Sequence, residues 1–465
     1  SLPALISLGD IGLPGPAQVL ASAVNGAWVA LCQGEPQALS LVIGSGTGEP
    51  IDVLHASDAS GRFLISGRGT AVQLIDTLRG SRVDLGQLSA DVRRARADFS
   101  AHRALSFDAR SEHLAYLRTR GTRDQHASVV VRKLADGSER SFSSGPGEVY
   151  RLRLSAAGAY LTLDVIREDT SHNGKLDWPA PEEPPTDEAC ARPKQLRYRS
   201  FQGRGDALTK AVISLGDGTL RDLPELVTTF GDALIVRAPD GSLLIDAKGV
   251  RTQLSPASCA GRVLFAEESR QLALVACDLP KKPGKREVWL VGKSFTKNLK
   301  VELQETELDR DSVSGVRLVP LYPGAESALV DLEKRELVPL KPGSRVLAVE
   351  GDATVIWRGD ELLRFAVDTK TEEPLAKGVA KNPDLLLAGS TLLISPFVVV
   401  GASLPALASP AARPLGLAST GHVLSGTPAP DGAFHDSKTE AASFGIQGPL
   451  HWLDARLEPP DGPPR

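Results

Sequence analysis

The sequence predicts an all-β fold, a single β-propeller of about seven to nine four-stranded blades, with eight as the best estimate. Three observations support this prediction. Short apolar strands recur along the chain at spacings of about 35 to 60 residues, as propeller blades do. The chain contains 44 glycines and 33 prolines, which interrupt it too often for long helices. No long stretch shows the 3.6-residue apolar period of an amphipathic helix.

Each repeat consists of a short strand, a small polar turn, an apolar strand, a variable loop and an alternating strand that ends in a charged turn. Ser57, Asp58 and Gly61 form the polar turn of the clearest copy, and the apolar strand 72–76 follows. One such sheet cannot bury both faces alone, so stacking against its neighbours must supply the core. In chain order, the copies lie at 25–31, 57–76, 106–137, 155–218, 234–245, 259–291, 316–332, 354–365 and 421–424.

We expect the propeller to extend over residues 1–455 as one domain. The proline-rich end, residues 456–465, is expected to be a disordered tail. A long insertion, residues 167–199, separates two strands of the fourth repeat.

Residues 385–412 carry no charge and are numerous enough to span a bilayer. Gly389, Pro396, Gly401 and Pro405 interrupt this segment, so two buried strands joined by turns fit it better than one helix. We therefore expect no transmembrane span.

The charges of the chain nearly balance. It has 53 lysines and arginines against 57 aspartates and glutamates, a formal net charge of −4. Nucleic-acid binding requires a marked excess of basic side chains to neutralise phosphates. We expect no nucleic-acid partner.

Two of the four cysteines, Cys259 and Cys277, bracket two apolar runs that flank a polar turn. The midpoint of the two positions falls within the turn, so the cysteines should face each other across a hairpin, at a distance that a disulfide spans. A disulfide implies an oxidising compartment. The alternative is a pair of buried free thiols on adjacent strands. The sequence does not fix whether Cys32 and Cys190 pair with each other.

The insertion contains the only pattern with recognisable site chemistry, a calcium-type loop. Hard oxygen donors at alternate positions allow a backbone to curl around one ion. Gly174 would make the sharp turn, Ala180 stands where a bidentate glutamate is usual, and Glu182 could replace that ligand. The candidate ligands are Asp169, Ser171, Asn173, Lys175 through its carbonyl, Asp177 and Glu182. The alternative is a solvated polar turn without an ion. The expected role of calcium is to rigidify the insertion.

The repeated pattern Ser-x-Asp-x-x-Gly-x-x-Leu, followed by an apolar strand and a Val-x-Leu-x-Asp strand, resembles the TolB-type, WD-repeat-like propellers of bacterial envelopes. The Gly-His and Trp-Asp dipeptides of true WD repeats are not reproduced. The resemblance implies a fold and an envelope location, in the periplasm or at the cell surface, more than an activity.

Two classes of function remain open. The first is a non-enzymatic exported propeller that serves as a scaffold for a protein or glycan partner. The second is a propeller enzyme, a lyase or hydrolase, with its site in the axial channel. The sequence has no Gly-x-Ser-x-Gly elbow of a serine hydrolase, so the scaffold is the first expectation.

Overall fold

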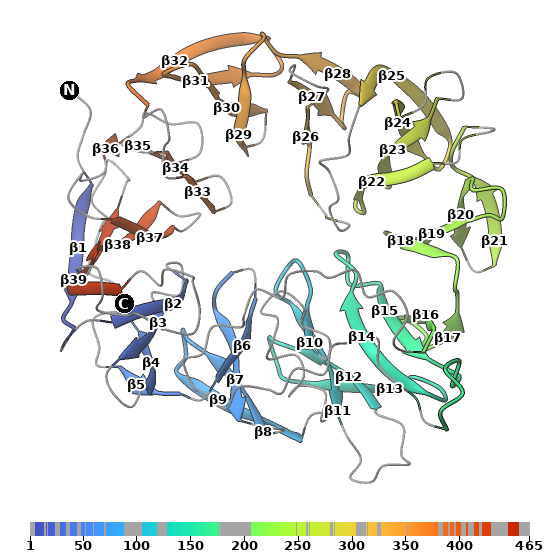
Figure 1. Cartoon of the computed structure of the whole chain (residues 1–465), viewed down its shortest axis with the longest axis horizontal. Helices are drawn as coiled ribbons and strands as arrows, with labels where there is room; N and C mark the ends of the chain where they lie inside the picture. The colour runs from blue at the N-terminus through green and yellow to red at the C-terminus, as the bar shows by residue number, and fades with distance from the viewer. Residues whose placement is uncertain are drawn as a thin grey trace.

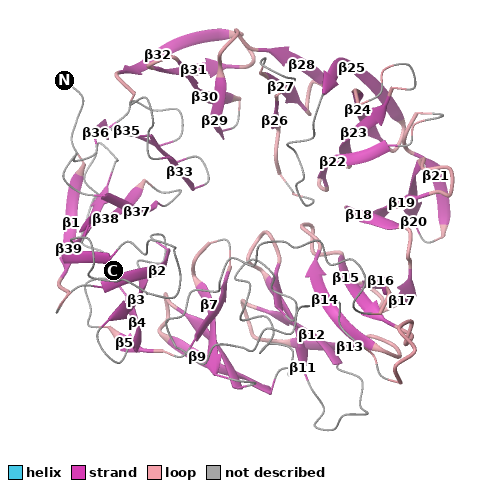
Figure 2. Cartoon of the chain, viewed as in Figure 1, coloured by secondary structure: helices cyan, strands magenta, loops and turns pink. Residues whose placement is uncertain are grey.

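Small β-sheets form a ring around a central axis in the computed structural model of the chain (Figure 1). Every element in the described part of the chain is a strand or a loop (Figure 2). The structure describes residues 5–13, 15, 17–23, 28–33, 38–43, 48–51, 53–58, 60–68, 71–87, 105–118, 128–174, 176, 206–247, 249–256, 259, 261–279, 282, 284–303, 313, 315–322, 327–350, 352–379, 385–388, 391–394, 397–400, 406–407, 413–417, 421–428 and 445–454.

We number the blades in chain order, and most have four antiparallel strands of which the first is innermost. Blade 1 is β2 (Ala17–Ala23), β3 (Trp28–Gln33), β4 (Ala38–Ile43) and β5 (Glu49–Pro50). Blade 2 is β6 (Val53–Ser57), β7 (Phe63–Arg68), β8 (Ala71–Asp76) and β9 (Ser81–Gln87). Blade 3 is β10 (Leu105–Phe107), β11 (His113–Arg118), β12 (Ser128–Lys133) and β13 (Glu139–Ser143).

The next three blades cover the middle of the chain. Blade 4 is β14 (Glu148–Leu154), β15 (Tyr160–Ile166), β16 (Leu208–Ser214) and β17 (Leu220–Asp222). Blade 5 is β18 (Leu226–Phe230), β19 (Ala233–Arg237), β20 (Leu243–Ala247) and β21 (Val250–Gln253). Blade 6 is β22 (Gly261–Glu267), β23 (Leu272–Asp278), β24 (Arg286–Gly292) and β25 (Phe295–Leu303).

The last four blades complete the ring. Blade 7 is β26 (Leu318–Leu321), β27 (Ala328–Asp331) and β28 (Glu336–Pro339). Blade 8 is β29 (Arg345–Glu350), β30 (Ala353–Arg358), β31 (Glu361–Ala366) and β32 (Thr371–Lys377). Blade 9 is β33 (Leu385–Ala388), β34 (Thr391–Ile394), β35 (Phe397–Val400) and β36 (Ala406–Leu407). Blade 10 is β37 (Arg413–Leu417), β38 (His422–Pro428), β39 (Gly445–Asp454) and β1 (Ile6–Ile11).

The propeller prediction is confirmed, but the predicted number of blades is wrong. Eight separate sheets, together with an eight-stranded sheet that comprises blades 1 and 10, make ten blades in the described part of the chain. The uncharged segment that begins at Leu385 supplies the extra blade, with β33, β34 and β35 pairing in antiparallel order. No helix among the described residues has the length and apolar character needed to cross a membrane.

The ring is closed by strands from opposite ends of the chain. β1 pairs with β39 from Ile6 opposite Asp454 to Ile11 opposite Leu450. The start of β2 pairs with the start of β39 through only two residue pairs. The amino-terminal strand therefore provides the main seam, and Ile11, which is buried, packs into the core of the closing blades.

The core lies between blades, as stacking requires. One continuous apolar cluster joins blades 2, 3 and 4 and includes Tyr116, Leu114, Leu152 and Leu163. Successive side chains of a strand point to opposite faces, so each blade places one row of residues in each of its two interfaces.

Blade 7 has the turn geometry of blade 2, which identifies its strands. Arg62 pairs with Asp76 through two hydrogen bonds, of 3.0 and 2.7 Å, and Asp76 also accepts the backbone N–H groups of the following turn. Arg317 and Asp331 repeat this arrangement at 3.3 and 2.8 Å. In these contacts β26 corresponds to β7, the second strand of blade 2.

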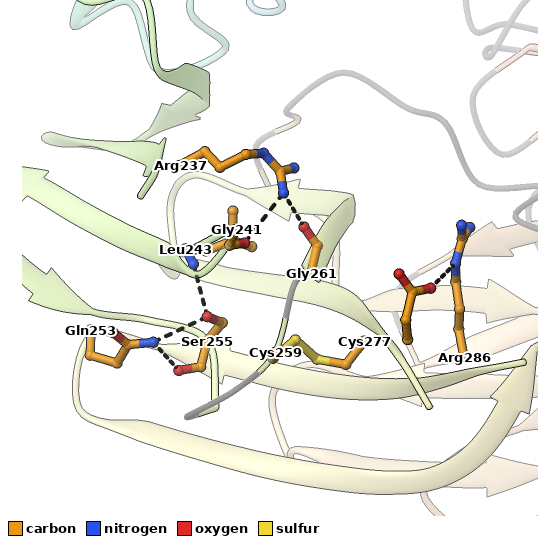
Figure 3. Close-up of a disulfide and its surroundings, with 10 residues drawn as sticks. Arg237, Gly241, Leu243, Gln253, Ser255, Cys259, Gly261, Cys277 and Arg286 are labelled. Atoms are coloured by element: carbon orange, nitrogen blue, oxygen red, sulfur yellow. Dashed lines mark hydrogen bonds and ion pairs between the residues drawn. A yellow bond between two sulfur atoms is a disulfide. The ribbon is translucent and has the colours of Figure 1, made fainter. Parts of the chain in front are cut away.

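The predicted disulfide is confirmed: Cys259 and Cys277 are bonded, with their Cα atoms 5.2 Å apart (Figure 3). The predicted register is wrong, because Cys277 lies opposite Gly261 and Cys259 precedes the strand. A Cβ atom on Gly261 would approach Val275 to 2.6 Å and the Cys259 sulfur to 2.9 Å, so the bond requires glycine there. The disulfide indicates an oxidising, extracytoplasmic compartment. Cys190 lies outside the described residues.

Candidate functional site

A cavity of about 840 Å³ lies along the inner strands of blades 2 to 5. Its walls come from β6, β10, β14 and β18, with further residues of β15 and β16. This volume is within the range of small-molecule binding sites, about 300 to 1,000 Å³. The charged residues that line the cavity are Asp58, Asp108, Arg151, Arg153, Asp164 and Lys210.

Four of these six side chains share one face of blade 4. Arg151 lies opposite Asp164, and Asp164 lies opposite Lys210 on the next strand. Residues directly opposite each other in an antiparallel sheet point to the same face. Arg153 is two residues beyond Arg151, so it projects from this face as well.

The other face of blade 4 is apolar and packs on blade 3. Leu152, Leu154, Leu161 and Leu163 alternate with the polar residues and belong to the cluster shared with blades 2 and 3. The alternation in β14 and β15 thus gives blade 4 one ordinary core face and one charged face.

The charged face is turned toward blade 5, and the contacts between these two blades lie beside the cavity. Val212 and Leu226 belong to a small apolar cluster between them. Tyr160 donates a hydrogen bond to the Asp232 carbonyl at 2.6 Å, and Arg221 pairs with Asp246 at 3.2 Å. The row Arg151, Asp164 and Lys210 remains at the cavity wall.

A buried carboxylate at one end of the cavity joins three blades. Glu268, only 1% exposed, is in the turn between β22 and β23 of blade 6. Its two oxygens accept the N–H groups of Ala156, at 3.3 Å, and Ala157, at 2.7 Å, from blade 4. It also accepts a hydrogen bond from the Thr229 hydroxyl of blade 5. Since Ala156 and Thr229 line the cavity, Glu268 fixes the positions of two of its walls.

Two aspartates of the cavity lining, on blades 2 and 3, organise turns. Asp58 accepts the Phe63 N–H at 2.7 Å. Asp108 accepts the Glu112 N–H at 2.8 Å and contacts the Nδ1 atom of His113 at 2.9 Å. Asp108, Glu112 and His113 have a spacing that a metal ion could use. The contacts from backbone N–H groups already account for the buried position of Asp108.

Two serine hydroxyls that line the cavity have structural partners. Ser106 accepts the N–H of Leu154 at 3.0 Å, which ties β10 to β14. Ser155 accepts the N–H groups of Ala159 and Tyr160, each at 3.0 Å. The Ser106 hydroxyl thus joins blades 3 and 4, and the Ser155 hydroxyl holds the turn between β14 and β15.

The first half of the predicted calcium loop is compact. The carboxylate of Asp169 accepts the Ser171 hydroxyl at 3.0 Å, the Asn173 N–H at 3.2 Å and the Gly174 N–H at 2.6 Å. Burial acts to raise the pKa of Asp169, but the hydrogen bonds from Gly174 and Ser171 outweigh it and hold this pKa below its ordinary value. The carboxylate is therefore ionised at neutral pH. Lys175, Asp177 and Glu182 lie outside the described residues.

A second carboxylate, which the sequence did not indicate, lies beside this loop. Asp206, 3% exposed, accepts the Ser171 N–H at 2.8 Å and the Thr170 hydroxyl at 3.3 Å. It follows the insertion in the chain and holds the loop to the start of β16. The loop conformation thus depends on both ends of the insertion.

The cavity was not predicted from the sequence. Two segments nevertheless carry a pattern that indicates a charged face on blade 4, because every second residue in them is polar. They are Arg151, Leu152, Arg153, Leu154 and Thr162, Leu163, Asp164. A blade between two neighbours should bury both faces, so a charged face is a departure that points to a site. Only the closed ring brings this charged face of blade 4 beside β6, β10 and β18.

Neither the family models nor the curated proteins include a match to this sequence. Solved propellers match its structure distantly. TolB from Acinetobacter baumannii is 11% identical, with a TM-score of 0.24 over 78% of this chain and 64% of that chain. The β-propeller domain of the trilobed protease from Pyrococcus furiosus is 9% identical, with a TM-score of 0.34 over 72% of this chain and all of that domain.

An acylaminoacyl peptidase structure matches at 10% identity and a TM-score of 0.32, and this chain spans 59% of its length. Similarity at this level concerns the fold alone. The resemblance to TolB-type propellers is therefore confirmed only as a distant likeness between propellers.

Proposed function

We propose that this chain is a non-enzymatic exported propeller of the bacterial envelope, and that it binds a protein or glycan partner at the cavity of blades 2 to 5. One observation carries the proposal: the charged face of blade 4 remains at a cavity wall where a propeller normally packs apolar residues. Leaving charges at an interface between blades forgoes core packing, and a ligand that contacts them accounts for that arrangement. The disulfide supports export, since such bonds persist outside the cytoplasm.

Site-specific photo-cross-linking tests this function. A photoreactive residue in place of Thr228, at the cavity, should form an adduct with a component of an envelope fraction. The same residue in place of Val250, 69% exposed on the outer strand of the same blade, is the control and should give none. Equal labelling from both positions, or none from Thr228, would refute the proposal. Release of a shortened product would instead favour the enzyme alternative, a lyase or hydrolase.

We also propose that the loop beginning at Asp169 binds calcium and rigidifies the insertion. The ionised carboxylate of Asp169, the hydroxyl of Ser171 and the neighbouring Asp206 place oxygen atoms around one short turn, which also contains Asn173. Lys175 through its carbonyl, Asp177 and Glu182 complete the proposed ligand set.

Calcium titration of chelator-treated protein should release or absorb heat and raise the melting temperature. Asp169→Asn should weaken binding by roughly tenfold or more, because it removes a charged ligand. Asp240→Asn is the matched control, since Asp240 accepts the hydroxyl and N–H of Ser242 in a similar exposed turn. Absence of both heat and a melting shift at millimolar calcium would exclude the site.

A further inference from the structure

We propose that the cavity of blades 2 to 5 recognises an acidic saccharide, a sugar that carries a carboxylate, and that Arg151, Arg153 and Lys210 bind this group. The inference rests on the proposed function, because it specifies the ligand of the same site.

Two cations of blade 4, Arg151 and Lys210, are only loosely paired within the described residues. Lys210 has no ion-pair partner in the part of the chain that the structure describes, and the closest Arg151–Asp164 contact is long, at 3.9 Å. The Arg151 side chain is 41% exposed, so its guanidinium remains accessible from the cavity. Cations that keep part of their exposure in a concave, partly desolvated wall attract an anion.

The spacing of these cations suits a carboxylate. Cβ atoms of directly opposed residues are about 5 Å apart, and residues two positions apart on a strand are about 7 Å apart. Lys210 lies two strands from Arg151, with Asp164 between them, so their Cβ atoms are about 10 Å apart. The long side chains of Arg151, Arg153 and Lys210 can span this distance to one small anionic group. Arginine binds a carboxylate through two parallel hydrogen bonds, which fixes the orientation of the ligand as well as holding it.

The total charge of the wall limits the ligand to a low charge. Arg151, Arg153 and Lys210 are balanced by Asp58, Asp108 and Asp164, three cations against three anions. The aspartates of blades 2 and 3 would repel a polyanion that filled the cavity. A single carboxylate on an otherwise neutral, polar body can contact the cations and leave these aspartates beside hydroxyl groups.

The remaining wall matches a sugar better than an acidic peptide. Thr162 and Thr228 offer hydroxyl groups, and Phe107 is a partly buried aromatic ring on which the C–H face of a sugar can pack. The leucines of β14 and β15 turn their side chains to the opposite face of blade 4. A peptide would require apolar pockets for its alternate side chains, and this wall directs polar groups at the ligand instead.

The test uses an array of oligosaccharides that end in uronic or sialic acid, their neutral counterparts and glutamate-rich peptides. We expect acidic saccharides to bind the full chain at least tenfold more tightly than neutral ones, with an affinity that falls as salt rises. Arg153→Gln and Lys210→Gln should each weaken binding roughly tenfold or more. Lys282→Gln, an exposed lysine that pairs with Glu302 on blade 6, is the control and should bind normally.

The outcomes separate this inference from the proposed function. Lys210→Arg should restore most of the affinity, and unchanged melting temperatures exclude misfolding as the cause of a loss. Peptide binding that depends on Lys210, without binding of acidic saccharides, overturns the inference and leaves the proposed function intact. Acidic saccharide binding that survives both cavity variants also overturns it. If no probe binds and Thr228 gives no adduct, both proposals fail.

Discussion

Deleting residues 1–12, which include β1, should destabilise the ring by about 5 kcal/mol and promote aggregation. The deletion removes five residue pairs between β1 and β39 and the buried side chain of Ile11. Backbone hydrogen bonds contribute about 1 kcal/mol each, and burial of an isoleucine about 2 kcal/mol. Against a typical total of about 5 to 15 kcal/mol, this is a large loss. The freed edge of β39 could then pair with other chains. Thermal and denaturant unfolding, with light scattering, measure both effects.

Three variants distinguish ring closure from a general loss of residues. Ile6→Thr and Leu8→Thr alter side chains of β1 that are 37% and 45% exposed, so they should have little effect. A circular permutant can join Asp454 to residue 5 through a short turn, because Asp454 and Ile6 are paired. It should recover the stability of the intact chain. A deletion that melts like the full protein, or a permutant as weak as the deletion, would show that β1 does not hold the ring together.

The contrast between β1 and the inner repeats shows why the fold was predictable and the blade number was not. Units such as 57–76 carry their own turn residues and alternation, so the sequence alone reveals them. Blade 10 combines β1 with strands more than 400 residues away, and no local pattern records that pairing. Blade 9 lacks charged turns between its strands, so residues 385–400 suggested buried strands without suggesting a separate blade.

In the candidate site, too, local features were predictable from the sequence and features that join several blades were not. The disulfide was predictable because both cysteines belong to one hairpin, although a bulge between Val263 and Phe265 displaces the register. Glu268 was not predictable, since its partners Ala157 and Thr229 lie on two other blades. The cavity was not predictable either, because its walls come from four blades that only the closed ring places side by side. Local pairing is thus encoded in short patterns, whereas the site arises from the closed ring.

Asp331→Ala should cost about 3 to 5 kcal/mol of folding free energy, because it leaves a buried cation without its partner. The Asp331 side chain is fully buried, and that of Arg317 is 16% exposed. The loss also frees the backbone N–H groups of Glu333 and Lys334, which Asp331 accepts. Arg317 keeps contacts with Asp368 at 2.7 Å and with Glu333 at 3.4 Å, so we expect the lower end of this range. Urea unfolding measures the difference, with Glu373→Gln, whose side chain is 70% exposed on β32, as control, and the control should change stability by less than about 0.5 kcal/mol.

The acid dependence of stability provides an independent check. Burial acts to raise the pKa of Asp331, but the hydrogen bonds from Arg317 and Lys334 outweigh it and lower this pKa below its ordinary value of 3.8. Arg317 and Lys334 likewise lower the pKa of Asp368 to about 2. A group whose pKa is lower in the folded state stabilises the protein above its unfolded pKa, and this contribution is lost as pH falls through the folded value. The intact protein should therefore lose stability steeply from about pH 5 to pH 2, and Asp331→Ala should lose less over the same interval. Parallel curves for the two proteins would mean that the Arg317–Asp331 ion pair contributes nothing to the acid dependence of stability.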